Sequence, residues 1–120
     1  MKTSIGIALT GIALWLAAPS SAAEGEEQTH SALEQGKAIA FDRNAGNCLS
    51  CHMMDDGELP GNAAPPLLQM QLRFPDRAVL RDQIWDATVR NPSSVMPPYG
   101  RNLVLTEEEI DLVVDYVLSL

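Results

Sequence analysis

The chain has few aromatic residues, few basic residues and little cysteine. Two Trp, two Tyr and two Phe occur among 120 residues, so a domain of this size would build only a marginal hydrophobic core alone. Eight Lys and Arg stand against sixteen Asp and Glu, and the net charge is −8. This balance argues against DNA, RNA or an anionic membrane as a partner and favours positively charged partner surfaces. We therefore expect one small domain that needs an additional stabilising group.

Strand-like alternation and internal repeats are also missing, so we predict an all-α fold of three to five helices joined by long loops. Ser31 and Glu34 have the spacing of a capping box and predict a helix over residues 31–43. A short helical turn is expected within residues 67–74, and Pro75-Asp76 begins a helix that reaches about Arg90. A second capping box at Thr106 precedes an amphipathic helix, whose inner positions are Ile110, Val113, Val114, Val117 and Leu118.

The N-terminal segment has the pattern of a secretory signal peptide. Lys2 precedes an apolar run over residues 5–18, and small residues follow it. We expect cleavage after Ala22 or Ala23, which assigns residues 1–23 to the signal, 24–30 to a flexible polar arm and 31–120 to the folded domain. The mature protein would then be periplasmic and free of the membrane. An uncleaved membrane anchor is the alternative.

Both cysteines and one of the two histidines lie within five residues, in the stretch "GNCLSCH". Cys48, Cys51 and His52 form C-x-x-C-H, the attachment signature of a c-type haem. Two thiols three residues apart lie on one face of a helical turn and can each form a thioether with a vinyl group of one porphyrin edge. His52 then supplies a ligand to the iron. The pattern predicts one covalent haem c, which would also complete the core.

Three other uses of this motif are open. A thioredoxin-type redox pair belongs beside a βαβ pattern, which the sequence lacks. A zinc site needs a further pair of ligands, and His30 alone gives poor support. A plain disulfide would not need His52.

The second axial ligand of the iron has five candidates. They are Met53, Met54, Met70, Met96 and His30. Met53 and Met54 follow His52 directly and cannot reach the opposite face of the ring, and Met70 reads as a core residue. Met96 precedes two prolines that hold its backbone extended, and a loop of that kind can present a thioether to the iron. We predict Met96 as the distal ligand.

Two further features concern the surroundings of the haem. A ligating imidazole usually donates its other N–H to a carbonyl group, which Pro65 or Pro66 can supply. Arg73, Arg77 and Arg81 recur every four residues and would either bind haem propionates, form a basic docking spot or make a solvated face balanced by Asp76 and Asp82.

The ordered set "GNCLSCH", "PGNAAPPL", "NPSSVMPPYG" and "LTEEEIDLVVDYVLSL" resembles the class I cytochromes c. More narrowly it is similar to the SoxX family, the monohaem subunits of the SoxAX cytochromes of sulfur-oxidising bacteria. The likeness spans about residues 36–120. It implies a class I cytochrome c fold in which Cys48 and Cys51 carry the haem and His52 and Met96 bind the iron. Pro65 would accept the hydrogen bond of His52, and Gly36 would lie where the first and last helices cross, near Tyr116. Ala64 departs from the glycine that class I members often have.

The resemblance also implies a function and partners. SoxX works with SoxA, a larger haem subunit that bears the reactive cysteine, as an L-cysteine S-thiosulfotransferase acting on the SoxYZ carrier protein. This chain would be the non-catalytic subunit of that heterodimer. It would take electrons from the oxidative coupling of thiosulfate to the carrier cysteine and pass them to a small cytochrome c. The alternatives are a free-standing periplasmic monohaem cytochrome c shuttle and a sensor with an open iron site.

Overall fold

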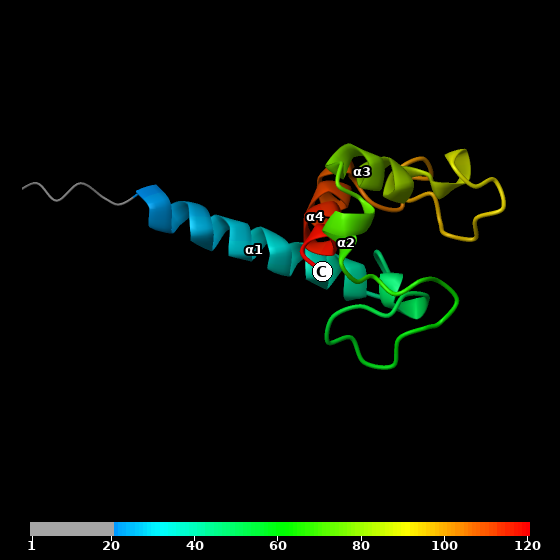
Figure 1. The fold of residues 1–120 in the computed structure, drawn as a ribbon, viewed down its shortest axis with the longest axis horizontal. Helices are drawn as coiled ribbons and strands as arrows, with labels where there is room; N and C mark the ends of the chain where they lie inside the picture. Colours follow the sequence, from blue (N-terminus) through cyan, green and yellow to red (C-terminus); the bar gives the residue numbers. More distant parts are fainter. Residues whose placement is uncertain (1–20) are drawn as a thin grey trace, which may run out of the picture.

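A computed structural model describes residues 21–120, and the prediction of an all-α fold is confirmed, because no strand occurs within them. Four α-helices and two short 3₁₀ helices make up this part of the chain (Figure 1). In chain order they are α1 (Ser21–Phe41), η1 (Cys48–Ser50), α2 (Met70–Arg73), α3 (Arg77–Trp85), η2 (Ala87–Val89) and α4 (Glu107–Leu118). The predicted turn within residues 67–74 is α2. The expected signal peptide lies almost entirely outside the described residues.

Helices α1 and α4 cross at Gly36, as expected. A Cβ atom on Gly36 would collide with the backbone oxygen of Leu112 and lie 2.8 Å from Cβ of Tyr116, so only glycine permits this approach. Ala40 and Ile110 are fully buried at the same interface. The rings of Phe41 and Tyr116 meet edge to face, with centroids 6.2 Å apart. The crossing is part of the hydrophobic core, to which Ala40, Ile110 and Tyr116 belong.

The predicted start of the first helix at Ser31 is wrong. Helix α1 already begins at Ser21, so residues 24–30 are helical rather than irregular, and this end of α1 projects beyond the rest of the fold in Figure 1. The reason is that residues 26–35 are rich in good helix formers, and His30 contacts Glu34 one turn later at 3.4 Å. Ser31 therefore lies inside the helix. The division into signal peptide, arm and domain stays a prediction.

The helix expected from Pro75 to Arg90 is interrupted at Asp86. Helix α3 begins after Asp76, whose carboxylate accepts a hydrogen bond from the Ala78 amide, and it ends at Trp85. Asp86 has an extended backbone with φ −157°, and its carboxylate accepts from the amide and the hydroxyl of Thr88. An aspartate that caps a new turn in this way competes with the continuing helix. The short helix η2 follows it.

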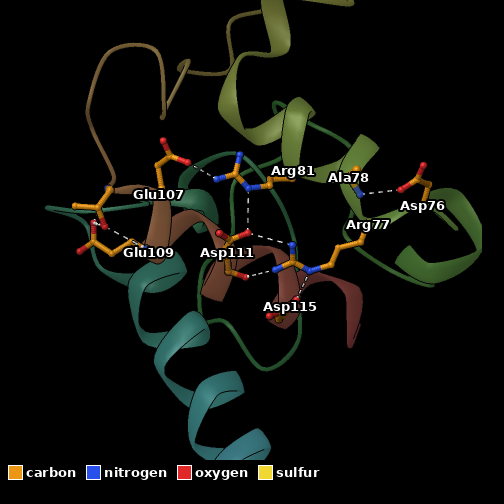
Figure 2. A network of polar contacts seen from close by, with 9 residues as sticks. Asp76, Arg77, Ala78, Arg81, Glu107, Glu109, Asp111 and Asp115 are labelled. Carbon is orange, nitrogen blue, oxygen red and sulfur yellow. Dashed lines mark hydrogen bonds and ion pairs between the residues drawn. The ribbon is translucent and has the colours of Figure 1, made fainter.

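The capping box that begins α4 is confirmed, because Thr106 and Glu109 exchange hydrogen bonds between side chain and backbone. Ion pairs join α4 to α3 (Figure 2). Arg77 binds Asp111 and Asp115, and Arg81 binds Asp111 and Glu107. The expected partners Asp76 and Asp82 are therefore wrong for Arg77 and Arg81, because these two arginines reach across to α4. The carboxylates of α4 hold the two helices in register.

Two long loops complete the fold, over residues 51–69 and 90–106, and both extend to the same side of the crossed helices in Figure 1. Lys37 of α1 holds the first loop through Asp55 at 2.7 Å. Within the described part of the chain, no helix is long and apolar enough to cross a membrane.

Candidate haem-binding site

The segment with both cysteines forms a tight turn directly after α1. Asn47 takes a left-handed conformation with φ 48°, which turns the chain after α1 and starts η1. The Cys51 and His52 amides then both donate to the Cys48 carbonyl, at 3.2 and 3.0 Å. Cys48 and Cys51 are both free thiols, three residues apart on this turn. The geometry fits attachment at two points on one edge of a flat ligand.

The electrostatics of Cys48 disfavour thiol redox chemistry. Burial raises the pKa of the Cys48 thiol to about 11, so the group stays protonated at neutral pH. Redox-active and metal-bound cysteines depend on the thiolate form, which this environment opposes. In the described residues, moreover, no cluster of three or more His, Cys, Asp and Glu side chains is placed to hold a metal ion. Neither the thioredoxin-type nor the zinc interpretation gains support.

The imidazole of His52 is oriented by Pro65. Nδ1 of His52 lies 2.7 Å from the Pro65 carbonyl oxygen, the contact that the resemblance implies. A proton on Nδ1 makes that contact a hydrogen bond and leaves Nε2 as a metal-binding atom. The loop is fixed by backbone hydrogen bonds from Ala64 to Cys51 at 3.0 Å and from Gly61 to Leu49 at 2.9 Å. Ala64 has no positive φ, so this loop does not require glycine there.

The second long loop presents Met96. Buried Tyr99 donates a hydrogen bond from its hydroxyl to the Gly46 carbonyl at 2.5 Å, which joins this loop to the cysteine segment. Gly100 donates its amide to the Trp85 carbonyl at 3.1 Å, and a Cβ on Gly100 would collide with the Trp85 ring. The loop is therefore held at both α3 and the cysteine turn. Half-buried Met96 lies between these contacts and Ser94, whose hydroxyl accepts a hydrogen bond from the Met96 amide at 3.2 Å.

The two loops enclose two hollows of about 360 and 630 Å³ that share several lining residues. The shared residues are Cys48, His52, Pro65, Gln83, Met96 and Tyr99. Apolar core side chains such as Leu67, Ile84 and Val117 line the smaller hollow. An apolar cleft between a thiol pair, an imidazole and a thioether suits a haem, so the residues present fit the group.

The other candidate iron ligands lie elsewhere or belong to the core. Met54 and Met70 are 1% and 2% exposed and pack in the hydrophobic core, although Met70 also lines the smaller hollow. Met53 is 45% exposed and lines neither hollow, and the exposed His30 is on the projecting end of α1. Met96 and His52 thus lie together at the cleft, but their role as iron ligands remains a prediction.

Gln83 and Tyr99 are among the residues of the cleft that sequence reasoning overlooked. Gln83 lines both hollows, yet its position inside α3 gave no signal beyond helical spacing. Tyr99 is the contact that joins the Met96 loop to the cysteine turn. A tyrosine between a diproline and a glycine is a detectable signal for a fixed loop, but its partner is 53 residues away and only the fold identifies it.

Comparison with known proteins agrees with this geometry. No curated protein matches the chain. A family model described as cytochrome c oxidase, cbb3-type, subunit III matches residues 31–117, which is most of the chain and includes the cysteine turn, both loops and most of α4. The fold, the C-x-x-C-H turn and this match identify the chain as a c-type cytochrome that belongs to the cbb3-type subunit III family of cytochrome c domains.

Proposed function

We propose that this protein carries one covalent haem c and transfers electrons as the monohaem subunit of a periplasmic SoxAX-type L-cysteine S-thiosulfotransferase. The observation that carries the redox part is the placement of the His52 imidazole and the Met96 thioether on the same cleft as the Cys48 thiol. The sulfur-pathway part rests on the resemblance of the motif set to SoxX. It names the SoxA-like subunit as the heterodimer partner, the SoxYZ-like carrier as the protein modified, and a small cytochrome c as the acceptor.

When bound, haem supplies one-electron redox chemistry, and this chain's residues hold and tune it. Cys48 and Cys51 would hold the haem through thioethers, and His52 and Met96 would bind its iron. The Pro65 carbonyl oxygen accepts a hydrogen bond from protonated Nδ1 of His52 and so sets the orientation of the imidazole. With both His52 and Met96 bound, the iron would have no open site for substrate. This favours electron transfer over ligand sensing, and it leaves bond formation to the partner subunit.

Replacing Met96 tests the redox part of the proposal. We expect Met96→Ala to keep the haem attached but to lose the weak long-wavelength absorption band of a methionine–iron bond, and to lower the midpoint potential, because a thioether ligand favours ferrous iron. Met53→Ala is the matched control, since that methionine is half-exposed and lines neither hollow. Retention of the band in Met96→Ala would exclude this ligand.

The partner assignment needs a reconstituted assay. Adding this protein to a SoxA-type subunit and SoxYZ should allow thiosulfate-dependent reduction of a small cytochrome c, and omitting it should slow that reduction. If omission has no effect and the isolated monomer exchanges electrons with unrelated donors, the free-standing shuttle is the better description. Rapid binding of carbon monoxide to the reduced protein would instead indicate an open iron site.

A further inference from the structure

Three arginines of this acidic protein have no carboxylate partner within residues 21–120, and all three line the cleft. Lys37, Arg77, Arg81 and Arg101 each form ion pairs with aspartate or glutamate. The arginines without such a pair are Arg43, Arg73 and Arg90. No aspartate or glutamate lines either hollow. Guanidinium groups thus gather where the protein provides no negative charge.

Arg73 and Arg90 share one part of the cleft, where both are next to Phe74. Arg73 is the last residue of α2, and its Nη1 donates to the Pro66 carbonyl oxygen at 2.8 Å. Arg90 follows η2, and its guanidinium lies 6.0 Å from the centroid of the Phe74 ring. Both arginines and Phe74 line the smaller, apolar hollow together with His52 and Met96. Two segments far apart in the sequence therefore bring two cations to one place.

We infer that Arg73 and Arg90 bind the two propionate carboxylates of the haem. A guanidinium offers forked N–H donors that match a carboxylate, and an apolar surrounding strengthens the charge-assisted hydrogen bonds. Haem is the group that the proposed function places in this cleft, and it carries two carboxylates on the edge opposite its vinyl groups. The inference therefore rests on the haem-binding part of the proposed function and is independent of the SoxAX assignment.

The other arginines fit this role less well. Arg43 lines only the larger hollow, together with Cys48 and Cys51, so it would lie near the edge of the haem that the cysteines hold. Arg77 and Arg81 are held by the carboxylates of α4. Of the stripe Arg73, Arg77 and Arg81, the structure thus separates the first from the other two.

The test measures the midpoint potential against pH for the haem-loaded protein and for the double variant Arg73→Gln/Arg90→Gln. In the parent protein the arginines keep both propionates ionised, so the potential should be nearly flat over about pH 5 to pH 8. Without the arginines, the propionate pKa rises into that range. Ionised propionate favours ferric iron, so the variant's potential should fall as the pH rises and should end below the parent value.

Arg77→Gln/Arg81→Gln is the matched control, since it removes the same two charges from sites paired with α4, and its profile should stay flat. The variant Arg73→Gln/Arg90→Lys keeps the charge at position 90. Compared with Arg73→Gln/Arg90→Gln, it should restore part of the flat profile. Because both arginines are exposed, the variants should fold, and an unchanged methionine–iron band will show it. A haem-loaded double variant with the parent's flat profile would overturn this inference alone. A parent protein that binds no haem would overturn the proposed function as well.

Discussion

The helical half and the loop half of this domain are stabilised in different ways. The crossed helices α1 and α4 make close contact at Gly36, and ion pairs join α4 to α3 (Figure 2). The loops over residues 51–69 and 90–106 contain no helix and are held by hydrogen bonds, such as those of Tyr99 and Gly100, and by the ion pairs of Lys37 and Arg101. The first loop nevertheless carries His52 directly after the cysteine turn, and the second carries Met96.

This difference indicates which part of the fold a haem would stabilise most. The helices bury their own apolar faces against one another, whereas the loops surround an apolar cleft of several hundred Å³. A haem in that cleft would supply the apolar surface that six aromatic residues cannot. We therefore expect the loops to depend most on the haem, and α3 and α4 to lose part of their core without it, since Ile84 and Val117 line the cleft.

The largest effect should come from removing the attachment points. We expect Cys48→Ala/Cys51→Ala to give a colourless protein without a cooperative thermal transition, because neither loop then has a core to pack against. Absorbance and circular dichroism during heating measure both properties. Ser50→Ala between the two cysteines is the control, since it is exposed and keeps both thiols. A colourless variant that melts cooperatively would mean that the loops do not need the haem.

The helical half can be disrupted without touching the cleft. Gly36→Ala should lower the free energy of unfolding by about 1–3 kcal/mol, because the new Cβ would meet the Leu112 backbone and force α1 and α4 apart. In an exposed helix the same change stabilises by about 1 kcal/mol. Gln35→Ala at the exposed neighbouring position is the control. If chemical denaturation finds Gly36→Ala as stable as the parent, the crossing is looser than the structure indicates.

The smallest effect is expected at the ion pairs between α3 and α4. Arg81, and then Arg77, hold the pKa of Asp111 below its ordinary value of 3.8. A carboxylate with a lowered pKa stabilises the fold above pH 3.8, and this contribution is lost as the pH falls through the lowered pKa. Since the Asp111 side chain is 42% exposed, we expect Arg81→Gln to cost about 1 kcal/mol or less at pH 7.

Denaturation at several pH values measures this contribution. The difference between Arg81→Gln and the parent should shrink as the pH falls below 3.8 and should also shrink in high salt. A difference that stays constant across pH and salt would assign the effect to packing of the Arg81 stem on Trp85, which its guanidinium approaches at 5.5 Å.

The sequence predicted the features that depend on local spacing. The capping box at Thr106 and the turn within residues 67–74 are confirmed by the structure, and so is the glycine at the helix crossing, which the resemblance implied. The apolar stripe of α4 is nearly all buried, with Leu118 only partly so. These features arise within a few residues or from a steric need that one residue type satisfies.

Features that depend on distant partners were predicted poorly. The early start of α1 and the break at Asp86 were missed, because propensity and side-chain competition shift a boundary without changing the apolar pattern. The carboxylate partners of Arg77 and Arg81 lie more than 25 residues away, so neighbours in sequence were wrongly chosen. The contact of Tyr99 with Gly46 was missed for the same reason.

The intact mass of the exported protein, produced in cells with a working c-type cytochrome maturation system, tests the central claim most directly. We predict a mass equal to the mature polypeptide plus one haem, and we expect the haem to stay attached after denaturation and acid extraction, because two thioethers hold it. A mass equal to the polypeptide alone, or haem lost on extraction, would contradict covalent attachment at Cys48 and Cys51.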